Sequence, residues 1–259
     1  MLGARRTVSI SIPMHRVTSL LVATAFVAAS LSATAGDCRG AVYLTLDTGT
    51  MTQAENIARV LNEENVKATF FLANEKTFHD DYSLDPGWDS YWRARAQEGH
   101  GFGNHTWSHH WAVRDDGNNI VMRDAAGKTH TLDQRGFCEE LKKVNAAFQR
   151  ATGKPLAGIW RAPGGRTTQN SIRYAASCGY PVHVHWDDAG FIGDELASEQ
   201  YPNELLLERA LKNIRPGDIL MLHLGIKSRK QPLAPVLKPL IQGLKARGLC
   251  FAKLDSGTR

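Results

Sequence analysis

The stretch Ala41–Glu63, with the sequence AVYLTLDTGTMTQAENIARVLNE, shows the pattern that the rest of the chain repeats. It begins with a short apolar, β-branched run that ends at Asp47, which is typical of a buried strand. Apolar residues then recur at helical spacing over residues 52–63. A strand followed directly by a helix is the unit from which parallel α/β sheets are built.

The same alternation continues to the end of the chain. We expect further strands at 68–72, 101–103, 158–160, 181–186, 219–222 and 249–253, and helices at 89–97, 137–148, 168–178, 203–214 and 234–246. The polar residues 114–128 predict an inserted hairpin or loop. Strands that alternate with helices require a parallel sheet, and without a glycine-rich phosphate turn a closed or nearly closed (β/α) barrel is favoured over a dinucleotide fold.

The first 35 residues are expected to be a secretory signal peptide, which leaves residues 36–259 as a single mature domain. Basic residues precede an acid-free apolar run at 20–31, and Ala-Thr-Ala at 33–35 offers a cleavage site. The apolar run is shorter than the ~20 residues of a spanning helix and contains Ser and Thr, so a membrane anchor is the less favoured alternative. We therefore expect export to the periplasm or medium without a stable membrane anchor.

Composition narrows the class of protein. The chain has 259 residues, 42% hydrophobic and 22% charged, which excludes a disordered tail, a collagen-like fibre and a small disulfide knot. The expected signal carries three arginines and no acid, so the net charge of the mature part is +2 rather than +5. No basic stripe is interleaved with aromatic residues, and nucleic acid is not an expected partner. The oligomeric state has no signature in the sequence.

The four cysteines lie far apart and form no CxxC zinc pattern. In an exported protein an even number suggests two disulfides, for which three pairings exist. We favour Cys38–Cys250, which would join the two ends of the domain, together with Cys138–Cys178. Free buried thiols are the alternative.

Reactive side chains stand where the expected strands end, and an α/β barrel gathers such positions at one mouth. Histidines four residues apart follow the third strand, so one helical turn would direct both imidazoles at one metal ion. Each of these residues alone has an ordinary structural explanation, such as a turn cap or a packed histidine. Together they predict one pocket, and the residues at these strand ends are Asp47, His105, His109, Arg161, Asp187, Asp188 and His223.

These residues predict metal-assisted hydrolysis. Two histidine ligands leave positions for water on a zinc ion, and zinc lowers the pKa of that water to about 7. A carboxylate beside the water removes its proton, and an acid protonates the leaving amine. Asp47 suits the base and His223 the acid.

The same residues resemble the motifs of the polysaccharide deacetylase family, the NodB-homology carbohydrate esterases, over residues 41–253. The sequence TLDTG at 45–49 resembles the first motif, TFDDG, in which the first Asp is the base and the second binds metal. The sequence GNHTWSH at 103–109 resembles the second motif, whose histidines bind metal. RAPGG at 161–165 and ILMLH at 219–223 resemble the motifs that carry the arginine orienting the base and the acid histidine.

The resemblance implies a distorted (β/α) barrel with seven or eight strands. It also implies a metal-dependent hydrolase, with Zn²⁺ as the favoured metal, that removes N-acetyl groups from an extracytoplasmic glycan such as peptidoglycan, a chitin-like polymer or poly-N-acetylglucosamine. His105 and His109 then bind the metal, Asp47 is the base, Arg161 orients it and His223 is the acid. The partner is an acetylated polysaccharide substrate.

The sequence departs from the family pattern at two places. Thr48 stands where the second metal-binding Asp belongs, and a neutral hydroxyl is a poorer ligand than a carboxylate. The metal would then bind through Thr48 more weakly, through a water, or with a third ligand from elsewhere. The fourth motif is reduced to Trp186-Asp187-Asp188, where an Asp normally keeps the acid histidine protonated, and we favour Asp188 narrowly. The alternatives are a glycan-binding pseudoenzyme and a related hydrolase of O-acetyl esters or non-sugar amides.

Overall fold

A computed structural model describes residues 38–255 and 257 of the chain. The expected signal peptide, residues 1–35, lies outside the described residues. Within the described part, no helix is both long and apolar enough to cross a membrane. The described residues fall within one compact unit, which is built around a parallel sheet.

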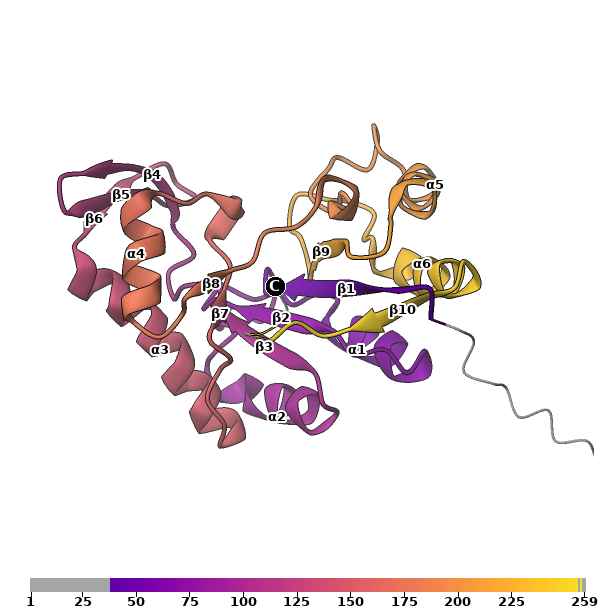
Figure 1. The fold of residues 1–259 in the computed structure, drawn as a ribbon, viewed down its shortest axis with the longest axis horizontal. Coiled ribbons are helices and arrows are strands. Elements are labelled where there is room, and N and C mark those ends of the chain that lie inside the picture. Colours follow the sequence, from indigo (N-terminus) through magenta and orange to yellow (C-terminus); the bar gives the residue numbers. More distant parts are fainter. Residues whose placement is uncertain (1–37, 256, 258–259) are drawn as a thin grey trace, which may run out of the picture. The chain divides into compact units, whose positions relative to one another are not determined.

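The main sheet has seven parallel strands (Figure 1). Six of them follow the order β10-β1-β2-β3-β7-β8, and the seventh, β9, pairs with the edge of β1 opposite to β2 and β10. This confirms the predicted (β/α) barrel architecture as a half barrel, because β9 does not pair with β8. It meets the segment after β8 through an isolated bridge between Phe191 and Met221 and through hydrogen bonds between Asp187 and Ile219. The strands are β1 (Gly40–Asp47), β2 (Thr69–Leu72), β3 (Gly101–Asn104), β7 (Ile159–Trp160), β8 (Val182–His183), β9 (Ile219–His223) and β10 (Leu249–Ala252).

Strand β1 is the centre of the sheet. Its last residues pair with both β2 and β9, and its first residues pair with β10. Val42, Leu44 and Leu46 are fully buried, which explains the nearly continuous apolar run that the sequence shows there. All of these pairings are parallel, so the carboxyl ends of β1, β2, β3, β7 and β9 lie at one edge of the sheet.

Helices cover the outer side of the curved sheet (Figure 1). Helix α3 illustrates how the sequence sets them: Asp133 caps its start by accepting a hydrogen bond from the Gly136 N–H at 2.7 Å, and Gly153 ends it with a φ of 75°. Its buried residues recur at helical spacing and face the sheet. The helices are α1 (Ala54–Glu63), α2 (Asp89–Gln97), α3 (Gln134–Thr152), α4 (Gln169–Ser177), α5 (Asn203–Asn213) and α6 (Ala234–Ala246), with short 3₁₀ turns η1 (Pro86–Trp88), η2 (Pro163–Gly165) and η3 (Asp188–Gly190).

The expected insertion is a small antiparallel sheet of three strands, β4 (Trp111–Asp116), β5 (Asn119–Arg123) and β6 (Thr129–Leu132). It packs on α4, where the Tyr174 hydroxyl donates to the Asn118 carbonyl at 2.5 Å. Ile120 is fully buried, so the insert has an apolar face of its own against the domain. It joins β3 to α3 and therefore begins directly after the two histidines of the predicted site.

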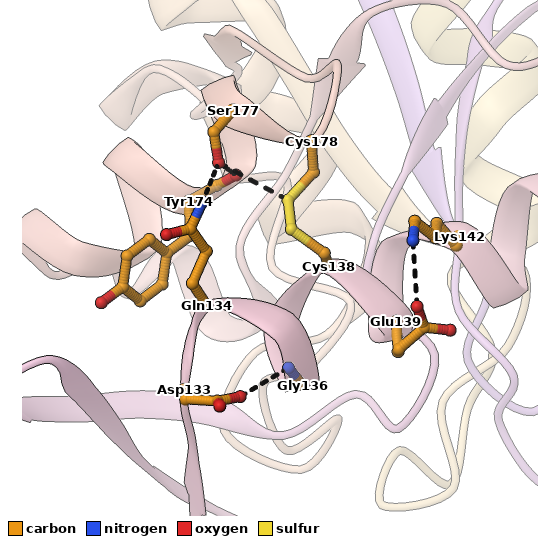
Figure 2. The surroundings of a disulfide bond; sticks show 9 residues. All are labelled: Asp133, Gln134, Gly136, Cys138, Glu139, Lys142, Tyr174, Ser177 and Cys178. Atoms are coloured by element: carbon orange, nitrogen blue, oxygen red, sulfur yellow. Dashed lines mark hydrogen bonds and ion pairs between the residues drawn. A yellow bond between two sulfur atoms is a disulfide. The ribbon is translucent and has the colours of Figure 1, made fainter.

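Both favoured disulfides are present, Cys38–Cys250 and Cys138–Cys178, with Cα atoms 5.7 and 5.6 Å apart. The first fastens the start of β1 to β10. The second ties α3 to the end of α4 (Figure 2). Each closes a long stretch of chain, and such links stabilise a fold mainly by restricting the unfolded chain.

Candidate active site

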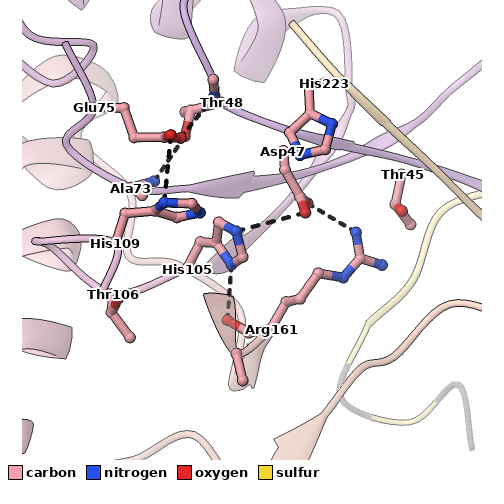
Figure 3. Close-up of polar contacts among 12 residues, drawn as sticks. Thr45, Asp47, Thr48, Ala73, Glu75, His105, Thr106, His109, Arg161 and His223 are labelled. Carbon is pink, nitrogen blue, oxygen red and sulfur yellow. Dashed lines mark hydrogen bonds and ion pairs between the residues drawn. The ribbon is translucent and has the colours of Figure 1, made fainter. Parts of the chain in front are cut away.

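Four parallel strands place the predicted reactive residues at one edge of the sheet. Asp47 and His223 are the last residues of β1 and β9, and they are direct partners in the register of those strands. Strands β3 and β7 pair at their ends, so the residues that follow them, His105 and Arg161, are also neighbours. Figure 3 shows these side chains converging from the different strands.

Asp47 is buried, with 2% of its surface exposed, and two partners surround its carboxylate. Arg161 Nη1 donates to Oδ1 at 2.8 Å, and His105 Nε2 lies 3.5 Å from Oδ2. Burial alone would raise the pKa of Asp47, but the charge of Arg161, with contributions from His223 and from His105 when it is protonated, outweighs burial and lowers the pKa below its ordinary value. Asp47 is therefore an ionised carboxylate in a fixed orientation.

Arg161 is fully buried and held on several sides. Its Nε donates to the Val184 carbonyl at 3.2 Å, and its guanidinium lies over the Phe71 ring, 4.3 Å from the ring centre. A buried cation of this kind requires an anion, and Asp47 supplies it. The pair fixes the orientation of the Asp47 carboxylate.

The segment from His105 to His109 is a turn and not a helix, so the predicted helical turn is wrong although the two rings do meet. Asn104 Oδ1 accepts from the Thr106 N–H at 3.0 Å, and Thr106 and His109 have φ values of 62° and 52°. These left-handed positions bend the chain back on itself. The ring centres of His105 and His109 consequently lie 4.9 Å apart.

His105 has the protonation state that metal binding requires. Its Nδ1 lies 2.8 Å from the Arg161 carbonyl, so Nδ1–H donates and Nε2 keeps its lone pair. Burial, opposed by the charge of Asp47, lowers the pKa of His105 to about 4. A neutral imidazole with a backbone-bonded Nδ1 is the usual form of a histidine ligand.

Glu75 is a member of the site that the sequence did not reveal. It lies in the loop after β2, and its Oε2 accepts from the Thr48 hydroxyl at 2.5 Å and from the Gly49 N–H at 2.7 Å. Its Oε1 lies 3.5 Å from His109 Nδ1. Burial raises the pKa of Glu75, but His109 and Thr48 lower it more, so Glu75 is a carboxylate. Thr48, which stands where the resemblance places a metal-binding aspartate, is thus in contact with a carboxylate from another loop.

Gly49 makes this arrangement sterically attainable. It has a φ of 60°, and a Cβ added there would lie 2.2 Å from the Gly225 carbonyl oxygen. Only glycine fits this close approach between the turn after β1 and the loop after β9. The turn directs the Gly49 N–H at Glu75.

His223 is paired with Asp194, so the expectation that Asp188 supports it is wrong. Asp194 Oδ2 accepts from the His223 backbone N–H at 2.6 Å and lies 3.2 Å from its Nδ1. Asp188 is exposed in the turn η3, and Asp187 Oδ2 accepts from the Ile219 N–H at 2.7 Å. The chain between η3 and α5 folds back over the end of β9, and this return brings in the later aspartate.

The charges around His223 keep it protonated. Burial lowers the pKa of His223, but the carboxylate of Asp194, with smaller contributions from Asp47 and Glu195, outweighs burial and raises the pKa to about 10. Glu195 Oε1 lies 3.6 Å from His223 Nε2. At neutral pH the site therefore holds an ionised Asp47 beside a protonated His223, which is the division of roles that a base and an acid need.

The structure thus brings together Asp47, Thr48, His105, His109, Arg161 and His223 and leaves out Asp188. The two missed residues, Glu75 and Asp194, had unequal signals. Glu75 follows the end of β2, so the rule that reactive groups gather after strand ends predicts it if applied to that strand too. Asp194 lies in the long loop between η3 and α5, and no local sequence pattern predicts the conformation of this loop.

The donor set fits a divalent metal. Figure 3 shows the His109 ring between Glu75 and His105, with Asp47 on the far side of His105. Two imidazoles beside carboxylates are the ligands that zinc takes in catalytic sites. A curved α/β sheet with such a donor set and a carboxylate–imidazolium pair at its strand ends is an arrangement suited to hydrolysis.

Comparison with known proteins identifies the family. The model of the polysaccharide deacetylase family matches residues 35–183, more than half of the 259-residue chain, and the chain belongs to this family. A peptidoglycan-N-acetylglucosamine deacetylase of Bacillus cereus is 24% identical over 218 residues, which are 83% of this chain and 86% of that protein.

Solved structures agree with the fold. A family 4 carbohydrate esterase from Streptomyces lividans, solved with acetate, has a TM-score of 0.62 at 20% identity and covers 84% of this chain and 94% of its own. A family 4 pseudoenzyme from Bacillus anthracis has a TM-score of 0.61 at 19% identity and covers 83% of this chain and 64% of its own. The chain therefore shares its half barrel with proteins described as enzymes and with one described as a pseudoenzyme.

Proposed function

We propose that the protein is a metal-dependent deacetylase that hydrolyses N-acetyl groups of an extracytoplasmic glycan. The observation that carries the proposal is the pairing of two opposite protonation states in one site. Arg161 holds Asp47 as a carboxylate, and Asp194 holds His223 as a cation, across neighbouring strand ends. A base and an acid placed in this way suit the removal of a proton from water and its delivery to a leaving amine.

His105 and His109 would hold the metal ion, which supplies polarisation of the acetyl carbonyl and of the attacking water. Asp47 takes the proton of that water at its carboxylate, and Arg161 keeps the carboxylate oriented and ionised. His223 donates a proton to the amine nitrogen as the carbon–nitrogen bond breaks. Asp194 keeps His223 charged before that step and is a positioning residue, because its carboxylate acts through the ring and backbone of that histidine.

Glu75 supplies the negative charge that Thr48 lacks. Its Oε1 faces His109 Nδ1, so an Nδ1–H directed at Glu75 leaves Nε2 of the same ring for the metal. Its other oxygen is held by Thr48 and Gly49, which fixes the carboxylate behind the ring. In this proposal Thr48 acts on the metal through Glu75 and His109.

The substrate class and location follow from the relatives and from chemistry outside the site. The relatives include deacetylases named for peptidoglycan N-acetylglucosamine and for chitooligosaccharides, so an N-acetylated glucosamine polymer is the proposed substrate. The two disulfides and the expected signal peptide support a place outside the cytoplasm.

One observation favours a second candidate, a glycan-binding pseudoenzyme. Thr48 replaces a ligand by a neutral hydroxyl, and a pseudoenzyme shares the fold. Acetate release from chitin oligomers and from peptidoglycan, measured with added zinc and with a chelator, separates the two. The deacetylase releases acetate that the chelator abolishes and zinc restores, whereas binding of the glycan without acetate release in zinc identifies the pseudoenzyme.

A further inference from the structure

A second group of potential metal ligands lies outside this site, on the antiparallel insert. His110, Asp124 and His130 each direct one ligand atom into a space where these atoms all lie within 4.8 Å of one another. His110 comes just before β4, Asp124 just after β5, and His130 lies in β6. Three separate segments therefore converge, and each of the residues is half-buried.

His130 and Asp124 form an ion pair through atoms that a bound metal ion would engage instead. His130 Nε2 lies 2.8 Å from Asp124 Oδ2, while Asp124 Oδ1 accepts from the backbone N–H groups of Ala126 and Lys128 at 3.0 and 2.9 Å. The second oxygen of Asp124 thus stays directed at the histidines. Within the described part of the chain, the ring nitrogens of His110 make no hydrogen bond.

The two imidazoles lie face to face, with ring centres 4.2 Å apart and planes inclined by 22°. Two neutral imidazoles and one carboxylate form a ligand set of the kind that zinc takes when it keeps a fourth position for water. Calcium and magnesium are disfavoured because they select oxygen ligands.

We propose that His110, Asp124 and His130 bind a divalent transition-metal ion of the zinc class, at a site separate from His105 and His109. The ion would fasten the segment after His109 to the far hairpin of the insert. His109, His110 and Asp124 line one hollow together with Glu75, so the second ion stands at the rim of the candidate active site. The proposal is independent of the deacetylase reaction, because these three side chains take no part in it.

The test is a count of zinc ions per chain by equilibrium dialysis with ZnCl2, on protein prepared without a polyhistidine tag. We expect two ions in the native protein, one in His105→Ala/His109→Ala, and one in His110→Ala/His130→Ala. His79→Ala is the matched control, because His79 is an exposed histidine outside both groups, and it should retain two. Asp124→Asn keeps the Oδ1 acceptor of the turn and should weaken the second site at least tenfold.

Folding of each variant is checked without metal by thermal unfolding. Zinc should then raise the melting temperature of His105→Ala/His109→Ala but give a smaller rise in His110→Ala/His130→Ala than in the native protein. A count that is unchanged in both His110→Ala/His130→Ala and Asp124→Asn overturns the proposal. If His110→Ala/His130→Ala and Asp124→Asn lower the zinc count but His105→Ala/His109→Ala does not, the result supports this second site. The same result contradicts the proposal that the active site binds a metal ion.

Discussion

The two sides of the candidate active site are built differently. On the base side, Asp47 and Arg161 are almost fully buried and meet at 2.8 Å. On the metal side, the His109 side chain is 31% exposed, Glu75 is 20% exposed, and the two lie 3.5 Å apart. The base side matches the family motifs residue by residue, whereas the metal side replaces an aspartate with Thr48 and a distant glutamate.

In the proposed function, the groups that transfer protons and the groups that bind the metal are therefore held by separate parts of the structure. The base and the acid are set by buried charge pairs that exist without a metal. The metal side depends on a looser, more exposed carboxylate, so it is the side where variation in sequence has the greater effect on affinity. Variants of each side should therefore change different quantities.

Asp47→Asn breaks the base side and has the largest expected effect. Loss of a general base costs about 10² to 10⁴ in rate, so acetate release should fall by that factor. Zinc content should stay at the native level, since Asp47 is not one of the proposed ligands. An Asp47→Asn protein that is folded and keeps native activity would show that another group removes the proton.

Asp194→Asn tests the acid through its partner, with Asp188→Asn as the matched control. Without the Asp194 carboxylate, the pKa of His223 should fall from about 10 toward its ordinary value, as followed by NMR titration. Acetate release should fall by roughly tenfold or more near neutral pH, because the acid loses its proton, and Asp188→Asn should be unchanged. Equal losses in both variants would contradict the pairing seen here.

The same charge pair gives a pH dependence of stability. The pKa of His223 is raised in the folded state, so its stabilisation is fully present below about pH 6.5 and is lost as the pH rises toward about 10. The free energy of unfolding of the native protein should exceed that of Asp194→Asn most at the low end of this window. A difference that grows with pH across the window is the contrary result.

Glu75→Gln breaks the metal side. Loss of a carboxylate behind a histidine ligand typically costs 10- to 100-fold in metal affinity, so the zinc dissociation constant should rise by about that factor. Activity at saturating zinc should fall much less than in Asp47→Asn. Adding Thr48→Asp to Glu75→Gln should restore affinity, whereas unchanged affinity in Glu75→Gln would remove Glu75 from the account.

Cys138→Ser/Cys178→Ser has the smallest expected effect on the reaction. This disulfide ties α3 to α4, away from the strand ends, so its loss should lower the free energy of unfolding by about 2–4 kcal/mol and leave acetate release per folded molecule unchanged. Chemical denaturation measures the first quantity and the acetate assay the second. A parallel loss of activity would mean that the insert and helices hold the site open.

The sequence predicted the helices and strands that show a regular spacing of apolar residues, and it predicted the reactive residues that follow strand ends. Helices α2 and α6 begin and end where the patterns at 89–97 and 234–246 predict, and β1 runs into Asp47 as expected. These features are local, because burial of one face fixes the spacing of apolar residues. The convergence of His105 and Arg161 followed from a general property of parallel sheets.

What the sequence missed depends on contacts between distant loops. The turn from His105 to His109 uses left-handed residues that no helical pattern announces. Glu75 meets Thr48 only because the loop after β2 folds over the end of β1, and Asp194 meets His223 only because the loop after η3 returns to β9. Such loops have no periodicity, so their partners are fixed by tertiary structure alone.

The most direct test of the proposed function measures acetate and new primary amine together, in one reaction of the zinc-loaded protein with an N-acetylglucosamine oligomer. Hydrolysis of N-acetyl groups predicts equal amounts of the two products, both abolished by a chelator. Acetate without amine from an O-acetylated substrate, or neither product from zinc-loaded protein, would contradict the account.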